Sequence, residues 1–549
     1  MKRSIKTLIT AFTIGAISVG AAWAGVGLTP AHHSLPAAHV GPVAQARSAV
    51  KHAAAHTSAV GATTSAASAT TAQSGAFSAA DLAPGQVLAG AAKVSIEPRP
   101  QDYNGTWVKE GCATLGDDSS HILDNFSDFR VKWPENPNCL YMGGFGIGPM
   151  NPITKWTDPY GLWARSVAIS DGSDTIVLTI LDGTYYFGKY ASMCTGCGFF
   201  DLSQTLGAQL GLKPESFFFA STHSHSAPDF IGGWGGVPDW YMRQVTDALK
   251  LSVTQAVQNE VPAVLEDGEQ FARQFNSQRR DFYRSAEDNA MSWVRALAVT
   301  DDVPCIGPLA ARCPTIATVG AFAAHPTFSS DGVATADYPG VFEKDVEDRF
   351  GGVGLYFETG LGNISRTSGS ESMGNGLAAL LPGKGWGTPI ANPDVIVKQV
   401  FFDQPVTNSG LTGLGLPGFF DRPFEQRPSS VSAGPNGTKP CRSASPVTVN
   451  TAVSAARIGS LLITGGPGEL FSNVTNTIEE QNPNGITMAL SLVNDGLGYI
   501  MQSFETDHVG RQVVGFVGQV AEYEDAYSID ACFGDQVLEQ TLALTSQLH

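Results

Sequence analysis

The sequence predicts an α/β fold with a large mixed, mainly parallel β-sheet core that is layered with helices. Between residues 87 and 549, short runs of β-branched and aromatic residues alternate with amphipathic segments of helical period. Several runs are apolar at every position, which is typical of strands buried on both faces of a parallel sheet. The region contains no internal repeat and no shift in composition, so we expect one domain over residues 87–549.

The N-terminal part of the chain predicts export. Residues 1–24 combine basic residues, an apolar run and the small-residue site Ala22-Trp23-Ala24, which are the three parts of a secretory signal peptide. Residues 25–86 consist mainly of Ala, Ser, Thr, Gly, Pro and His and cannot bury enough apolar surface to offset chain entropy. We expect a low-complexity disordered linker there, and a secreted or cell-envelope-associated, extracellular protein.

The first predicted strands and helix form one βαβ unit. Residues 174–181 and 217–220 are apolar runs of buried-strand type, and residues 202–212 between them are amphipathic. A second helix is predicted over residues 239–257, because Pro238 precedes them and an apolar residue recurs at every fourth position. The recurring residues are Tyr241, Val245, Leu249, Val253 and Val257.

Four further strands are predicted later in the chain. They are residues 316–324, 353–357, 461–464 and 487–493. The Gly- and Pro-rich connection 411–440 is too long for a plain linker, and we expect it to cover a site.

Composition and charge exclude several classes of partner. Only 15% of the residues are charged and the net charge is −18, so the chain repels nucleic-acid backbones and has no electrostatic attraction for anionic lipid. We expect no nucleic-acid partner and predict no protein partner. Any peripheral contact with a membrane or micelle would have to be apolar.

All eight cysteines lie within residues 87–549, and an even number in an exported chain predicts disulfides. Local spacing favours four pairs, although spacing alone does not fix connectivity. The pairs are Cys112 with Cys139, Cys194 with Cys197, Cys305 with Cys313, and Cys441 with Cys532. Cys194 and Cys197 could instead form a redox-active pair.

Side chains with catalytic chemistry follow the predicted strands. They are His223 and His225, His325, Ser365, Glu469, and Tyr499. Because ligands bind outside the carboxyl ends of the strands in open α/β sheets, these loops are expected to converge on one site. Imidazole and carboxylate groups are the ligands that a catalytic zinc ion uses, and a His-x-His pair on an extended segment directs both rings to one face. The sequence therefore predicts a metal site at the carboxyl ends of the strands.

Each of these residues also has a purely structural interpretation. His223, His225 and His325 could be hydrogen-bonded loop histidines, and Glu469 could stabilise the N-terminus of a helix. Tyr499 taken alone could be a core residue, and Ser365 lacks the Gly-x-Ser-x-Gly elbow of a nucleophile. For Asp182, at the end of the strand 174–181, a partnership with a zinc histidine and the capping of a turn both remain open.

An ordered set of motifs resembles the catalytic domain of the neutral, non-lysosomal ceramidases, without their usual C-terminal immunoglobulin-like domain. The motifs are Ala89-Gly-Ala-Ala-Lys-Val-Ser-Ile-Glu-Pro98, Met142-Gly-Gly-Phe-Gly146, Thr222-His-Ser-His-Ser-Ala-Pro228, Phe322-Ala-Ala-His-Pro326, Gly362-Asn-Ile-Ser365, Arg457-Ile-Gly459, Pro467-Gly-Glu469 and Gly498-Tyr499. They occur in the family's order over nearly all of residues 87–530. The chain departs from the family around the serine, where Asn363 and Arg366-Thr367 replace the usual residues.

This resemblance implies zinc-dependent hydrolysis of the N-acyl amide bond of ceramide, giving a sphingoid base and a fatty acid, with one Zn²⁺ per chain. It implies four zinc ligands, which are His223, His325, Glu469 and Tyr499. Ser365 matches the family's essential serine, and His225 lies near the zinc-bound water. The substrate-side arginine corresponds to Arg279 or Arg280.

Three hypotheses follow from the sequence. The first is an exported zinc amidohydrolase for ceramide-like lipids. The second is a zinc hydrolase for another lipid or N-acyl amide, and the third is a catalytically silent envelope binding protein on the same fold. The complete set of expected site residues is present, which favours an enzyme. The set comprises both histidines of the His-x-His motif, His325, Glu469 and Ser365. The sequence leaves open whether Ser365 attacks the substrate or stabilises the oxyanion.

Overall fold

The computed structural model describes most of the chain from residue 82 onward. The described residues are 82–98, 112, 139–145, 151–156, 159–280, 286–300, 305–328, 331–408, 411–412, 421–434, 440–506 and 523–548. They belong to the second of two units of the chain, Phe77–His549. The expected signal peptide and nearly all of the expected linker lie outside the described residues. So do residues 413–420 and 435–439 of the connection expected to cover the site.

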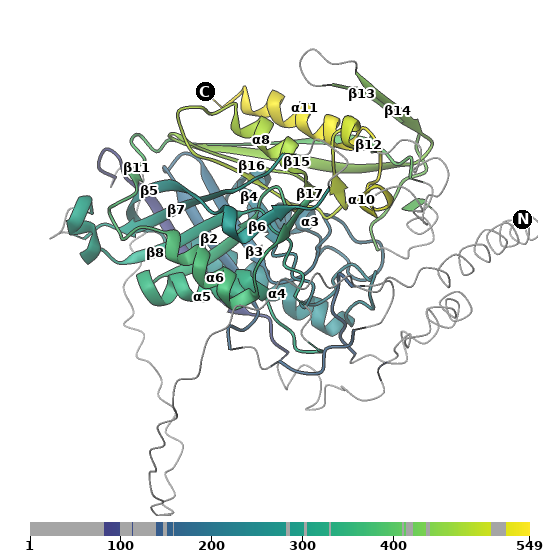
Figure 1. The fold of residues 1–549 in the computed structure, drawn as a ribbon. Coiled ribbons are helices and arrows are strands. Elements are labelled where there is room, and N and C mark those ends of the chain that lie inside the picture. The colour runs from purple at the N-terminus through teal and green to yellow at the C-terminus, as the bar shows by residue number, and fades with distance from the viewer. Residues whose placement is uncertain are drawn as a thin grey trace, which may run out of the picture. The chain divides into compact units, whose positions relative to one another are not determined.

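A nine-stranded mixed sheet forms the first layer of the fold (Figure 1). Its main path runs β4 (Phe217–Ser221), β3 (Thr175–Leu181), β2 (Trp163–Ser170), β1 (Val87–Ser95), β5 (Val261–Phe271), β7 (Ala290–Ala298), β8 (Thr315–Phe322) and β9 (Val353–Glu358). The short β11 (Thr388–Pro389) pairs with β5. Only β3 with β4 and β8 with β9 are parallel, and the other neighbours on the path are antiparallel.

The prediction of a mainly parallel sheet is therefore wrong, although the mixed α/β class holds. The strands that the sequence did not reveal carry buried charges within apolar surroundings. Arg165 of β2 is buried because Glu343 lies 2.8 Å from its Nε and Glu347 lies 2.5 Å from its Nη1. Arg295 of β7 is buried against Glu266 of β5 at 2.8 Å. Such pairs compensate the cost of burying a charge, but they interrupt the apolar pattern from which strands are predicted.

Both parallel pairs are βαβ units whose connecting helices cover one face of the sheet. Helix α3 (Phe199–Leu210) connects β3 to β4, as predicted, and α5 (Asp337–Phe350) connects β8 to β9. Helix α4 (Asp239–Gln258) begins after Pro238, as the four-residue periodicity predicts, and buries Tyr241, Val245, Leu249 and Val253. Apolar residues of α3 and α4 pack on β3 and β4, while α5 and α6 (Ser370–Leu380) pack on β7 to β9.

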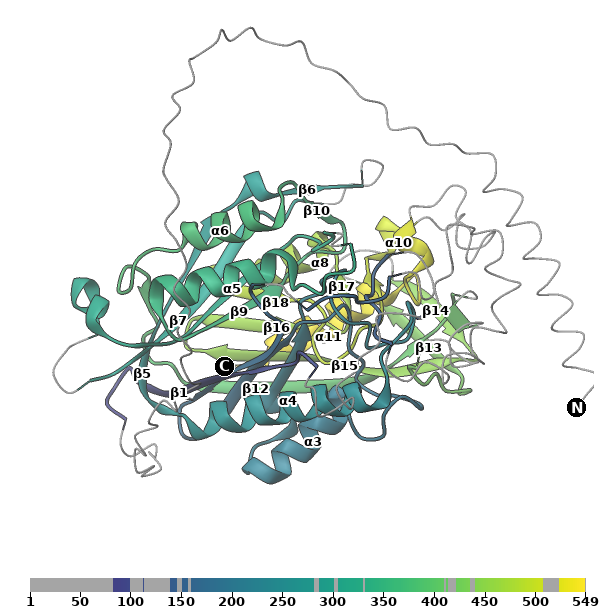
Figure 2. The same cartoon turned by 90° about the horizontal axis from the view of Figure 1, so that it is seen from below.

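A second sheet packs on the opposite face of the first. Its four strands run in the order β12 (Val395–Pro405), β15 (Thr448–Ile458), β16 (Leu461–Gly465) and β18 (Thr487–Leu490). Here too one pair is parallel, β16 with β18, and α8 (Ser472–Glu479) connects its strands. Helices α8 and α11 (Phe533–Thr545) cover the outer face of this sheet (Figure 1). The view from below shows α3, α4 and α5 on the opposite side of the fold (Figure 2).

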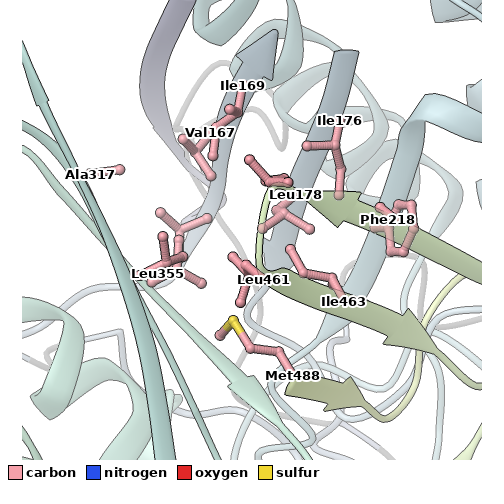
Figure 3. Packing of buried hydrophobic residues seen from close by; sticks show 14 of the residues in the cluster. Val167, Ile169, Ile176, Leu178, Phe218, Ala317, Leu355, Leu461, Ile463 and Met488 are labelled. Atoms are coloured by element: carbon pink, nitrogen blue, oxygen red, sulfur yellow. The ribbon is translucent and has the colours of Figure 1, made fainter. Parts of the chain in front are cut away.

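The largest hydrophobic core lies between the two sheets. Figure 3 shows Leu178 and Phe218 of the first sheet facing Leu461, Ile463 and Met488 of the second. All five side chains are fully buried. The fold is thus a sandwich of helices, sheet, sheet and helices, and this core fixes the two sheets to each other.

Short elements complete the described part of the chain. The strands are β6 (Asn276–Gln278), β10 (Ile364–Arg366), β13 (Ser429–Ala433), β14 (Cys441–Ser445), β17 (Glu469–Leu470) and β19 (Tyr499–Ile500). The helices are η5 (Pro214–Ser216), η6 (Arg273–Phe275), η7 (Gly307–Arg312), η8 (Ser503–Glu505) and α10 (Tyr523–Ala526). Strand β10 pairs with β6, and β17 pairs with β19.

All four predicted disulfides are present. They join Cys112 to Cys139, Cys194 to Cys197, Cys305 to Cys313, and Cys441 to Cys532. None of the helices in the described ranges combines the length and apolar content needed to span a bilayer.

The packing between the sheets predicts the effect of Ile463→Ala. Removing this buried side chain leaves a cavity in the shared core, and we expect the free energy of unfolding to fall by about 2–5 kcal/mol. Leu251→Ala is the control, because 47% of the Leu251 side chain is exposed in α4 and its truncation should cost less than about 0.5 kcal/mol. Chemical denaturation measures both, and equal losses would contradict a core between the sheets.

Candidate metal centre

Three histidines converge beyond the carboxyl ends of β4 and β8. His223 and His225 follow β4, and His325 follows β8. Ring nitrogens of the three lie within 4.8 Å of one another. The Nε2 atoms of His223 and His225 are 3.4 Å apart. The structure therefore brings together the three histidines that the sequence analysis assigned to one site.

Backbone carbonyl groups hold two of these rings in one tautomer. Nδ1 of His223 lies 2.9 Å from the carbonyl oxygen of Thr184, and Nδ1 of His325 lies 2.7 Å from that of Leu361. A carbonyl only accepts hydrogen bonds, so these contacts assign the ring proton to Nδ1. Both Nε2 atoms then present a lone pair to the cluster, as metal-binding histidines do.

The expectation of an extended His-x-His segment is wrong, although the two rings do meet. His223 has a φ of +58°, in the left-handed region that side chains with a Cβ rarely adopt. The chain turns at His223, and the backbone N–H of His225 donates to the carbonyl of Pro326 at 3.0 Å. A left-handed residue held by tertiary contacts, and not strand alternation, orients the pair.

Glu469 supplies a buried carboxylate to the same point. Its Oε2 lies 2.9 Å from Nε2 of His325 and 3.6 Å from Nε2 of His223. Its Oε1 accepts a hydrogen bond from the hydroxyl of Tyr185, whereas Oε2 accepts none from any described residue. Buried carboxylate oxygens are normally satisfied, so an oxygen left facing imidazole lone pairs fits a bound cation.

The electrostatics of the cluster agree with this arrangement. Burial lowers the pKa of His223 to about 4 and the pKa values of His225 and His325 well below 6.5, so the rings are neutral near pH 7. Burial also raises the pKa of Glu469 well above its usual range. Neutral imidazoles and a carboxyl group that gains from a nearby cation form a donor set suited to Zn²⁺.

Tyr499 and Arg279 lie beside this cluster. Residue 499 is directly opposite Glu469 in the parallel pair of β17 and β19, and its hydroxyl is 3.5 Å from Nε2 of His325. Arg279 Nη2 is 3.3 Å from the same hydroxyl, and its Nε donates to Glu524 at 2.9 Å. Arg280 instead pairs with Asp525 at 3.1 Å. Of the two adjacent arginines, Arg279 is thus the one at the site.

Ser365 lies at the edge of the cluster, and Asp182 contacts the backbone of β2. Ser365 is half-buried in β10, where it forms a bridge to His325 and lies opposite Ser277 of β6. Asp182 accepts a hydrogen bond from the backbone N–H of Trp163 at 2.7 Å. His223 Nδ1 contacts the main-chain carbonyl of Thr184. This carbonyl, and not the carboxylate of Asp182, is thus the partner that orients the His223 ring.

The similarity of this structure to known ones agrees with the motif resemblance. No family model matches the chain, and no curated protein matches it in sequence. One similar solved structure is the neutral ceramidase from Pseudomonas aeruginosa, at 14% identity and a TM-score of 0.54, over 85% of this chain and 75% of that one. A second is a ceramidase complexed with C2, at 15% identity and a TM-score of 0.55, over 85% and 76%. The fold is similar to that of neutral ceramidases.

Two contributors to the site were missed from the sequence. Tyr185, whose hydroxyl donates to Glu469, also packs edge-on against the His223 ring with centroids 4.7 Å apart. It follows the predicted strand 174–181, so the rule that found the other residues could have found it. Glu524 could not have been found, because its pairing with Arg279 spans most of the folded region.

The structure explains why residue 144 of the Met142-Gly-Gly-Phe-Gly146 motif is a glycine. Its φ is +91°, and a Cβ at this position would lie 2.2 Å from Cγ of His225. Phe145 packs edge-on against the same ring with centroids 5.0 Å apart. The motif therefore lets the backbone pass directly against the His225 imidazole.

Gly144→Ala tests this close approach. Its new Cβ must displace the His225 ring, so we expect a loss of unfolding free energy about 1–3 kcal/mol larger than for the control. The control is Gly85→Ala, since Gly85 also has a positive φ, +82°, but open space around its Cβ position. Denaturation curves compare the two variants, and a shift of the His225 imidazole signals in NMR spectra should appear only in Gly144→Ala. Equal stability losses with unmoved imidazole signals would refute the contact.

Proposed function

We propose that this chain is an exported zinc-dependent amidohydrolase that cleaves the N-acyl amide bond of ceramide-like lipids into a sphingoid base and a fatty acid. The observation that carries the proposal is Oε2 of Glu469, buried without a hydrogen bond and 2.9 Å from Nε2 of His325. It occurs at the carboxyl ends of strands in a fold similar to that of neutral ceramidases.

His223, His325, Glu469 and Tyr499 would hold the zinc ion. When bound, zinc lowers the pKa of a water ligand toward 7 and polarises a carbonyl group as a Lewis acid. The chain's own contribution is to hold the two imidazoles through the carbonyls of Thr184 and Leu361 and the carboxylate through the Tyr185 hydroxyl. These outer contacts keep the ligands oriented toward one point.

His225 is the proposed proton carrier. Burial and the charges of Arg279 and Arg366 lower its pKa, so its ring is neutral and able to accept a proton. Its Nδ1 is buried and makes no hydrogen bond with any described residue. A ring placed beside the cluster can take a proton from the nucleophile and return it to the amine leaving group.

Ser365 and Arg279 are the proposed groups on the substrate side. Ser365 either attacks the amide carbonyl or donates a hydrogen bond to the developing oxyanion. Arg279 is held by Glu524 and by the carbonyl of Gly362, at 2.9 and 2.8 Å. Fixed in this way, its guanidinium adds positive charge next to the phenol of Tyr499, where negative charge is stabilised.

The remaining parts of the proposal concern location and partners. The predicted N-terminal signal peptide and the four disulfides support an extracellular protein. A lipid substrate requires peripheral contact with a membrane or micelle, and the net charge of −18 gives no reason to expect nucleic acid. A zinc hydrolase acting on a different lipid or N-acyl amide is the second candidate, because Arg366 and Thr367 change the surroundings of the serine.

Metal removal provides the first test. Fatty acid release from a fluorescent N-acylsphingosine by the purified protein should stop with a zinc chelator and return with added Zn²⁺. Glu469→Gln should lower zinc content and slow release on the order of 100-fold or more. Glu425→Gln is the control, because 55% of that side chain is exposed and it pairs with Arg427. Chelator-resistant turnover would contradict the zinc mechanism, and a zinc-loaded protein without turnover would contradict the substrate.

Ser365→Ala tests the catalytic role of this serine, with a serine of the neighbouring strand β6 as the control. We expect kcat to fall on the order of 100-fold, because either attack or oxyanion stabilisation is lost. Ser277→Ala, directly opposite in β6, should stay near the wild-type rate. Rapid-quench mass spectrometry then distinguishes the two roles: an acyl group on Ser365 indicates attack, and none indicates the water route. Equal rates for both variants would remove Ser365 from the site.

A further inference from the structure

Arg366 lies at the edge of the candidate metal centre, one residue after Ser365. Both belong to β10, and residue 365 forms a backbone bridge to His325. The guanidinium carbon of Arg366 lies 5.5 Å from the centre of the Phe328 ring, and Phe328 is three residues after His325. The cation and the aromatic ring therefore flank the histidine loop together.

A buried aspartate fixes this pair in place. Asp337, fully buried at the start of α5, accepts a hydrogen bond from the backbone N–H of Phe328 at 2.9 Å and pairs with Arg366 Nη1 at 3.4 Å. The Phe328 carbonyl in turn accepts a hydrogen bond from the hydroxyl of Ser226, next to His225.

Arg366 retains hydrogen-bonding capacity after these contacts. Only its Nη1 is engaged, with Asp337 and with the Ser370 hydroxyl at 3.3 Å, and its Nε and Nη2 make no hydrogen bond with any described residue. Its side chain is 16% exposed, so part of it faces solution. Arg279 differs, because its Nε and Nη2 already contact Glu524, Gly362 and Tyr499.

We infer that Arg366 binds a negatively charged oxyanion group of the substrate beside the scissile amide, with Phe328 packing against the adjacent alkyl chain. This inference rests on the proposed function and specifies its substrate class as N-acyl amide lipids with an anionic head group. The planar guanidinium fork suits phosphate and carboxylate oxygens. Because the net charge of −18 repels anions, a local cation at the site is needed to select them. Phe328 is 41% exposed and offers the apolar surface.

Phosphate and carboxylate share this chemistry, and the experiment separates them. The substrates are N-dodecanoylsphingosine, its 1-phosphate and N-dodecanoylglycine, each assayed with wild-type protein, Arg366→Gln, Arg366→Lys and Arg427→Gln. Arg427 is the matched control, because it is an exposed arginine that pairs with Asp403 and contacts none of the site residues. We expect wild-type kcat/KM to be at least tenfold higher for one anionic substrate than for the neutral one. Arg366→Gln should remove that preference, while Arg366→Lys should keep part of it.

Binding provides a readout that does not depend on turnover. Isothermal titration compares dodecyl phosphate and dodecanoate with neutral dodecyl maltoside, for wild type and Arg366→Gln. We expect the variant to bind the preferred anion at least tenfold more weakly and the neutral detergent equally well.

Equal anion affinity in both proteins would overturn the inference. Undiminished hydrolysis of neutral N-dodecanoylsphingosine, with no anion preference, would overturn it while leaving the proposed function intact. Anion binding lost in Arg366→Gln, but no hydrolysis of any substrate, would overturn the proposed function instead.

Discussion

The site depends on acceptor atoms of two histidines and one glutamate that are buried close together. Main-chain carbonyls hold the protons of His223 and His325 on Nδ1, so both Nε2 atoms face Oε2 of Glu469 as acceptors. Acceptors this close repel one another in a medium of low dielectric constant. A cation at their common point converts that repulsion into coordination. The surrounding fold thus holds the donor atoms that such an ion requires at one point.

The parallel pairs of strands explain why these side chains meet. His223 follows β4, which is parallel to β3, and His325 follows β8, which is parallel to β9. Glu469 and Tyr499 follow β16 and β18, the parallel pair of the second sheet. The core between the sheets then sets the two groups of loops against each other. The antiparallel strands β1, β2, β5 and β7 complete the sheet without supplying any of the four proposed ligands.

This division also explains what could be predicted from the sequence. Strands of the parallel pairs are apolar at nearly every position, so the periodicity reveals them and the loops that follow carry the site. Strands β2 and β7 contain Arg165 and Arg295, whose burial depends on Glu343 and Glu266 in distant segments. A local pattern contains no information about such partners, and the sheet was therefore expected to be mainly parallel. The same limit hid Glu524, whereas Tyr185 follows the predicted strand 174–181 and could have been found by the rule that found the other site residues.

The C-terminal segment 523–548 contributes to the site from outside both sheets. Glu524 and Asp525 of α10 pair with the adjacent Arg279 and Arg280, and the disulfide to Cys532 joins this segment to Cys441 of β14. The charge of Arg279 is thereby balanced by a buried carboxylate, and its donors are used in holding its own position. Arg366 is held through Nη1, and its Nε and Nη2 make no hydrogen bond with any described residue. One arginine is thus suited to orient Tyr499 and the other to bind a ligand, which gives the two sides of the centre different electrostatic roles.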